Sequence, residues 1–83
     1  MFYTYILYSF KIDRYYIGFS ENPEKRLKER HNKGAVKATK GGIPYKLVAT
    51  KEFVKIEDAR KEELRLKKKK SRTYLEYLIK GNW

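Results

Sequence analysis

Hydrophobic residues near the N-terminus fall into two short stretches that are typical of β-strands. Phe2–Tyr8 and Tyr15–Phe19 consist mainly of aromatic and β-branched residues, and a polar segment that carries Asp13 separates them. This arrangement predicts a β-hairpin. A third stretch of similar character, Tyr45–Phe53, predicts a third strand.

Helical signals occupy most of the remaining chain. Asn22 is a suitable N-cap ahead of a proline, so a surface helix is expected over Pro23–Asn32. The basic, glycine-bearing segment 33–44 is expected to be a mobile loop with at most one helical turn. Two further helices are expected over Ile56–Lys70 and Ser71–Ile79, because both segments are rich in helix formers.

The last of these helices has two candidate starting points. Ser71 is a suitable N-cap, and Thr73 with Glu76 has the spacing of a capping box. Its hydrophobic residues, Leu75 and Leu78 among them, are expected to form the buried side.

The length of 83 residues and the absence of cysteine restrict the class of protein. We expect one small domain over residues 1–83, without disulfide bonds, cysteine-bound zinc or a thiol nucleophile. No apolar run approaches the ~20 residues that cross a bilayer, and none has the form of a signal peptide. The sequence therefore predicts a soluble, cytoplasmic protein with no membrane partner.

Positive charge is in large excess, with 21 Lys and Arg residues against 10 Asp and Glu and a formal net charge of +11. Such an excess favours a polyanionic partner, and nucleic acid is the first candidate. One group of basic residues would contact phosphates without reading sequence. Its members are Arg30, Lys67, Lys68, Lys69, Lys70 and Arg72. Alternatively, Lys67–Lys70 are solvated residues at a helix C-terminus, where the helix dipole favours positive charge.

The helix expected over 56–70 carries a carboxylate in its apolar face. Four residues at spacings of three, four and three fall on one stripe, namely Ile56, Ala59, Glu63 and Leu66. Carboxylates are rarely buried without a partner. Glu63 is therefore expected either to pair with a Lys or Arg at the rim of the core or to face a cleft.

Two tyrosines of the hairpin are placed to meet. Tyr5 and Tyr16 become diagonal neighbours on one face of the sheet if Leu7 pairs with Tyr16. Gly18, at the end of its strand, lets another backbone or a ligand come close. On this pattern alone, the tyrosines serve either packing or catalysis.

Several groups of residues, in order along nearly the whole chain, carry a resemblance to a known family. Tyr5 comes first, and Glu63 stands near the end, four residues after Ala59. Four matching stretches lie between these two residues: Tyr15-Tyr16-Ile17-Gly18, Arg26-Leu27-Lys28-Glu29, Thr39-Lys40-Gly41 and Pro44-Tyr45-Lys46-Leu47-Val48. In these features the chain resembles the GIY-YIG endonucleases, in particular the small stand-alone bacterial members.

The resemblance implies an α/β (α+β) domain in which helices flank a small three-stranded antiparallel sheet. It also implies a metal-dependent endonuclease that hydrolyses phosphodiester bonds in nucleic acid with one divalent metal ion. We expect Mg²⁺ or Mn²⁺ as the ion and favour DNA as the substrate, although the sequence does not distinguish DNA from RNA. Glu63 resembles the family's metal-binding carboxylate and Arg26 its phosphate-stabilising arginine. Tyr5 and Tyr16 resemble the two motif tyrosines near the attacking water. No attached sequence-reading module is expected.

The sequence departs from the family pattern in two places that bear on the site. The first motif reads Tyr3-Thr4-Tyr5, which keeps only the final tyrosine of Gly-Ile-Tyr. Family members usually have His or Tyr four residues after the arginine, but Arg30 holds that position and His31 follows it. A shift of one residue rotates a helical side chain by ~100°. Either the helix ends early and His31 joins the catalytic residues, or Arg30 faces the site instead.

These departures leave two other functions open. One is a non-catalytic nucleic-acid-binding protein on the same scaffold, and the other is a small basic protein whose partner is a protein or a nucleoprotein assembly. The enzyme is favoured because Tyr5, Tyr16, Arg26 and Glu63 occur together. Binding alone does not require a carboxylate that faces a phosphate.

Overall fold

A computed structural model describes residues 1–83, and it contains the expected antiparallel sheet of three strands. The strand order is β2-β1-β3, so the N-terminal strand is central and pairs antiparallel with both neighbours. Each strand lies within one residue of its expected bounds. The strands are β1 (Phe2–Ser9), β2 (Arg14–Ser20) and β3 (Tyr45–Phe53).

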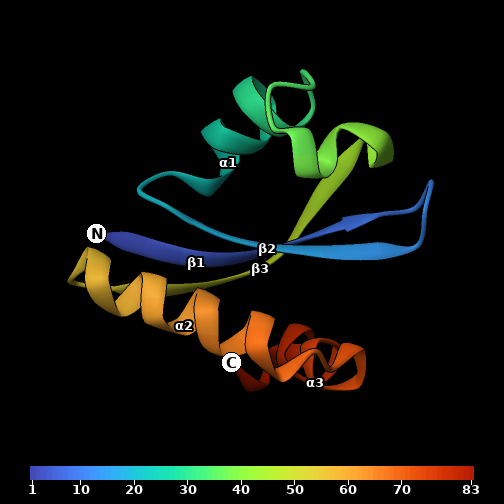
Figure 1. Cartoon of the computed structure of the whole chain (residues 1–83). Helices are drawn as coiled ribbons and strands as arrows, with labels where there is room; N and C mark the ends of the chain where they lie inside the picture. Colours follow the sequence, from blue (N-terminus) through green and yellow to red (C-terminus); the bar gives the residue numbers. More distant parts are fainter.

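Helical segments cover both faces of the sheet and complete the expected α+β fold (Figure 1). The chain between β2 and β3 lies over one face, and the chain after β3 lies over the other. The first layer contains α1 (Pro23–Arg26), the π-helical turn η1 (Leu27–His31) and the 3₁₀-helix η2 (Lys37–Gly42). The second layer contains α2 (Ile56–Lys69), α3 (Arg72–Tyr77) and the π-helical turn η3 (Leu78–Asn82). None of the helices is long and apolar enough to span a bilayer.

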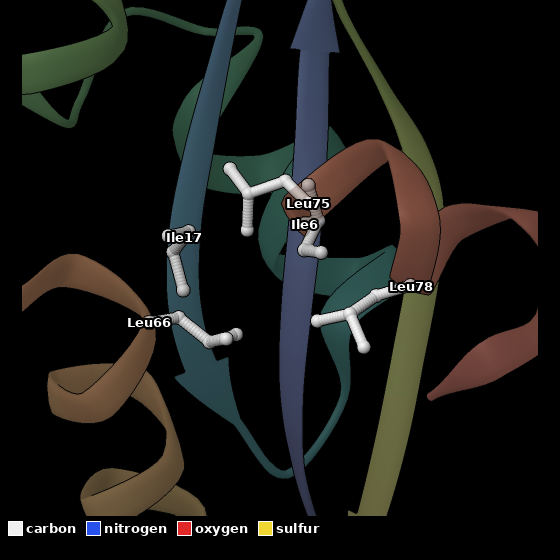
Figure 2. Packing of buried hydrophobic residues seen from close by; sticks show 5 residues of the cluster. All are labelled: Ile6, Ile17, Leu66, Leu75 and Leu78. Carbon is white, nitrogen blue, oxygen red and sulfur yellow. The ribbon is translucent and has the colours of Figure 1, made fainter. Parts of the chain in front are cut away.

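The central strand supplies side chains to a hydrophobic cluster on each face, because successive strand residues point to opposite sides. The cluster under α2 and α3 is made of Ile6, Ile17, Leu66, Leu75 and Leu78 (Figure 2). The cluster on the other face is made of Tyr5, Leu7 and Tyr45. Because both faces are covered, β1 is buried along most of its length.

Short polar side chains cap two of the helices. The Asn22 side chain accepts a backbone N–H from the first turn of α1 at 3.1 Å, which confirms its expected role. The Ser71 hydroxyl accepts a backbone N–H from the first turn of α3 at 3.1 Å. Ser71 is therefore the cap of this helix, and Thr73 lies inside it.

Helix α2 begins at the expected residue and ends within one residue of its expected end, but its first residue is more exposed than expected. Ile56 was expected in the apolar stripe but is 45% exposed, because it is the first residue of the helix and burial begins at Ala59. The helix ends at Lys69, since Lys70 has a left-handed conformation with φ of 50°. That turn sends the chain from α2 into α3.

The segment expected to be a mobile loop is instead packed onto the sheet. Within it, η2 buries Thr39 and Gly42. The Asn32 side chain joins the start of this segment to the start of β3, because its amide donates to the Tyr45 carbonyl at 3.1 Å and its oxygen accepts the Tyr45 N–H at 2.7 Å. A side chain at the end of η1 thus makes both hydrogen bonds that a strand residue would make.

Leu66 provides a test of this packing. Leu66 is 2% exposed between α2 and the sheet, so Leu66→Ala should lower the free energy of unfolding by about 2–5 kcal/mol in urea denaturation. Leu64 lies on the same helix but is 50% exposed, so Leu64→Ala should change that energy by less than about 0.5 kcal/mol. Equal losses for the two variants would contradict the described core.

Candidate active site

A small cleft of about 200 Å³ gathers the residues that the sequence singles out. Its lining comes from both helical layers and from the two strands of the hairpin. The lining residues are Tyr5, Tyr16, Gly18, Phe19, Arg26 and Glu63. Since α1 and α2 cover opposite faces and β2 is an edge strand, the cleft spans the β2 edge of the sheet.

The strand register brings the two tyrosines to one face. Leu7 pairs with Tyr16 and Tyr5 pairs with Gly18, which is the register required for Tyr5 and Tyr16 to be diagonal neighbours. A Cβ built on Gly18 would lie 2.5 Å from both Cζ and Oη of Tyr5. Residue 18 must therefore be glycine for the Tyr5 ring to lie across β2.

The π-helical turn η1 explains how the histidine reaches the site. Asn32 N donates to the Leu27 carbonyl at 2.9 Å, five residues back, so this turn contains one residue more than an α-helical turn. The extra residue brings His31 to the inside, where it is fully buried, and leaves Arg30 exposed. Of the two arrangements that the sequence left open, the structure contains the one with His31 inside.

His31 connects Tyr5 to the segment above the sheet through both ring nitrogens. Nε2 lies 2.7 Å from the Tyr5 hydroxyl, and Nδ1 lies 3.0 Å from the Thr39 hydroxyl. The Thr39 hydroxyl donates its hydrogen to the Val36 carbonyl at 3.2 Å, so it accepts from His31. Nδ1 therefore carries the proton of the neutral ring, and Nε2 accepts the hydrogen of Tyr5. The Tyr16 ring packs beside the imidazole, with centroids 5.1 Å apart.

Burial keeps both members of the Tyr5–His31 pair uncharged. Burial raises the pKa of Tyr5 to about 12, and the positive charge of Arg26 only partly opposes this. Burial, followed by the positive charges of Arg26 and Arg30, lowers the pKa of His31 to about 4. At neutral pH the pair is a phenol that donates to a neutral imidazole.

Glu63 faces the cleft and also has a cationic neighbour, so both sequence-based expectations for it hold. The residue is buried on α2, and Lys67 Nζ lies 3.1 Å from its Oε2. It is the only carboxylate in the lining of the cleft, and three or more His, Cys, Asp or Glu side chains gather nowhere in the fold. One carboxylate fits a hydrated Mg²⁺ ion, which keeps several waters and binds substrate phosphates. Glu63 is the residue that would hold it.

The basic residues after Glu63 differ in the contacts that they make. The ammonium of Lys69 lies 4.4 Å from the centroid of the Tyr74 ring. The guanidinium of Arg72 donates to the backbone carbonyl and to the carboxylate of Asp13, at 2.8 and 2.6 Å. Arg72 thereby holds the hairpin turn against α3, and its contact with nucleic acid stays a prediction. Lys67 and Lys70 line a second cavity of about 380 Å³.

Thr39 is the site residue that sequence reasoning missed. It lies in a stretch that matches the family pattern, Thr39-Lys40-Gly41, but a threonine in a polar segment has no pattern that indicates a buried partner. Thr39 is a buried residue of η2, and its position beside His31, from which it accepts a hydrogen bond, depends on how that segment folds back. Only the tertiary arrangement identifies it.

Comparison with known proteins agrees with this geometry. The family model described as the GIY-YIG catalytic domain matches residues 1–76 of the 83, a span that contains every residue lining the cleft. No curated protein and no solved structure matches the sequence significantly. The matched domain is a nuclease domain, whose substrate is nucleic acid. Since the match covers nearly the whole chain, the protein belongs to the GIY-YIG family.

Proposed function

We propose that this protein is an active, metal-dependent endonuclease that hydrolyses phosphodiester bonds in DNA. The observation that supports it best is the convergence of Tyr5, Tyr16, Arg26 and Glu63 on one cleft. Metal-dependent hydrolysis of a phosphodiester uses a metal ligand, a positive charge for the phosphate and an acceptor for a proton of water. The lining of the cleft contains one group suited to each task.

Arg26 and a metal ion bound by Glu63 would stabilise the negative charge of the phosphate. The planar guanidinium of Arg26 would donate to a non-bridging oxygen of the scissile phosphate, and its charge does not depend on pH in the working range. Glu63 would ligate Mg²⁺ or Mn²⁺ through its carboxylate. When bound, the ion supplies a Lewis acid that stabilises charge on the phosphate and the leaving oxygen.

Tyr5 would orient the attacking water. Its hydrogen is engaged by His31 Nε2, so its oxygen has only lone pairs left for the cleft. As the water oxygen bonds to phosphorus, one water proton would pass to Tyr5 and the Tyr5 proton to His31, while the bond from phosphorus to the leaving sugar oxygen breaks and solvent protonates that oxygen. Burial is the main cause that lowers the pKa of His31, and the positive charge of Arg26 comes second; a phosphate bound at Arg26 would offset this second cause.

Tyr16 would support this pair from the side. Its ring packs against the His31 imidazole and borders the cleft, so it limits the rotation of the imidazole and keeps water out from that direction. Tyr16 would thus be a positioning residue for the pair of Tyr5 and His31.

Phosphates flanking the cleft would be held by basic residues that carry no catalytic group. We propose the residues expected from the sequence: Arg30, Lys67, Lys68, Lys69, Lys70 and Arg72. All of them are exposed, as contact with a nucleic-acid backbone requires. Such contacts depend on the phosphate charge and not on the base sequence.

The alternative of a non-catalytic nucleic-acid-binding protein relied largely on Arg30 at the usual histidine position. The π-helical turn brings His31 to Tyr5, so the motif change does not remove a histidine from the site. A cleavage assay separates the two functions. Labelled duplex, flap, junction and RNA substrates would be incubated with Mg²⁺, with Mn²⁺ and with chelator. Metal-dependent cleavage of DNA is expected, and binding without cleavage on every substrate would contradict the proposal.

Glu63→Gln should reduce the cleavage rate at saturating DNA by about 10²–10³-fold, because it removes the metal-binding carboxylate while keeping its shape. Binding of DNA and the urea midpoint should change little. The matched control is Glu57→Gln, which alters an exposed carboxylate in the first turn of the same helix and should cut at the parent rate. An unimpaired Glu63→Gln enzyme would make Glu63 a structural residue.

Arg26→Lys should reduce the same rate by about 10–100-fold, since a point charge does not reproduce the two parallel hydrogen bonds of a guanidinium. The control is Arg60→Lys, an equivalent change at an exposed position of α2. Parent-like rates for both variants would show that Arg26 contributes charge alone or nothing.

The lowered pKa of His31 predicts a dependence of stability on pH. The folded protein binds the His31 proton only near pH 4, whereas the unfolded chain binds it near pH 6.5, so stability present above pH 6.5 is lost as the pH falls toward 4. Between about pH 6.5 and pH 5 the free energy of unfolding should fall by on the order of 1 kcal/mol. His31 is the only histidine, and unfolded carboxylates titrate near pH 4.

The measurement combines urea denaturation with NMR titration of the His31 ring. His31→Asn should show no such loss over this pH interval, because it has no group that titrates there. An NMR pKa of about 6.5 for His31 would contradict the buried, neutral imidazole and the hydrogen-bond pattern assigned to it.

A further inference from the structure

Lys67 lies beside Glu63, where it neutralises the carboxylate proposed to hold the metal. Its Nζ is 3.1 Å from Glu63 Oε2 and 5.6 Å from the centroid of the Tyr16 ring. The Glu63 side chain is 11% exposed, whereas that of Lys67 is 45% exposed. The carboxylate is held by its surroundings, while the ammonium sits at the end of a flexible stem with four carbons. Lys67 is therefore the member of the pair that can move.

A second place for the Lys67 ammonium lies next to the first. Lys67 also lines the cavity of about 380 Å³ between the hairpin and the connection of α2 to α3. Tyr16 borders this cavity and the catalytic cleft, so the two are adjacent. Arg14 and Lys70 make the lining of the second cavity basic. A nucleic-acid backbone that continues from the cleft past Tyr16 would bring a phosphate within reach of Lys67.

We propose that Lys67 is a positioning residue that couples nucleic-acid binding to metal binding. In the free protein its ammonium occupies Glu63 and competes with the divalent cation. When nucleic acid binds, the ammonium turns to a backbone phosphate and leaves the carboxylate to the ion. This inference rests on the proposed function, because it takes Glu63 as the metal ligand.

Electrostatics gives the coupling its direction. An ammonium and a divalent cation on one carboxylate repel each other, so each lowers the affinity of the site for the other. A phosphate that attracts the ammonium removes this competition, and the metal then binds more tightly. Because coupling between two binding events is reciprocal, the metal strengthens nucleic-acid binding by the same factor.

The test is a titration of the full chain with Mn²⁺ in the absence of nucleic acid. Electron paramagnetic resonance measures the concentration of free Mn²⁺ at each step. Lys67→Met keeps the apolar stem over Tyr16 and removes the charge, so it should bind Mn²⁺ about two- to fivefold more tightly than the parent. Lys67→Arg keeps a cation at this position and should resemble the parent. The matched control is Lys61→Met, which removes the same charge from an exposed position of α2 that makes no ion pair, and should change the affinity by less than about twofold.

A second titration includes a phosphorothioate duplex that resists cleavage. Adding it should raise the Mn²⁺ affinity of the parent, and the gain should be smaller for Lys67→Met by about the same two- to fivefold factor. Equal gains for the two proteins would overturn the transfer of Lys67 to a phosphate.

Glu63→Gln separates failure of this inference from failure of the proposed function. If Glu63→Gln weakens Mn²⁺ binding but Lys67→Met does not strengthen it, the metal ligand stands and the competition by Lys67 is overturned. If Glu63→Gln binds Mn²⁺ as the parent does, Glu63 is not the ligand and both proposals are overturned. Circular dichroism of each variant confirms that the comparison is between folded proteins.

Discussion

The ring of Tyr5 lies where any residue other than glycine at position 18 would place its Cβ. This close passage lets a tyrosine of the central strand extend across β2 to the edge of the sheet. There its hydroxyl meets His31, which the π-helical turn has brought inside. His31 in turn bonds Thr39, so the segment above the sheet is held to the same phenol. The absence of a side chain at Gly18 thus leaves the space in which Tyr5 can reach His31 and, through it, Thr39.

The groups of the site differ in how burial and charged neighbours act on them. The buried part consists of neutral groups, Tyr5, His31 and Thr39, because burial disfavours the charged forms of the phenol and the imidazole. Among the charged groups, Lys67 is exposed, Arg26 is partly exposed, and Glu63 is buried but paired with the Lys67 ammonium. The cleft thus combines an uncharged pair with a paired carboxylate and a guanidinium.

Much of the fold follows from local signals in the sequence. The three strands have the expected bounds within one residue, because alternating and β-branched residues define them without reference to the rest of the chain. Asn22 caps α1 as expected, because its side chain bonds a backbone N–H only three residues further along the chain. The sequence predicts a buried Ile56 and a mobile loop over 33–44, whereas the structure has an exposed Ile56 and a packed segment. Exposure at a helix end and packing over a sheet depend on neighbours that are distant in sequence.

Patterns along the chain predict a basic α+β domain and the position of Glu63 on an apolar helix face, and ordered motifs carry the resemblance to a nuclease family. These features follow from composition, from the spacing of residues and from the helical period. All three can be obtained from the chain without knowledge of its fold. Packing between distant segments, in contrast, places His31 and not Arg30 next to Tyr5 and Thr39 next to His31. The structure also identifies Lys67 as the partner of Glu63. A single extra residue in a helical turn reverses which side chain is buried, and its presence is settled by packing between segments far apart in the chain.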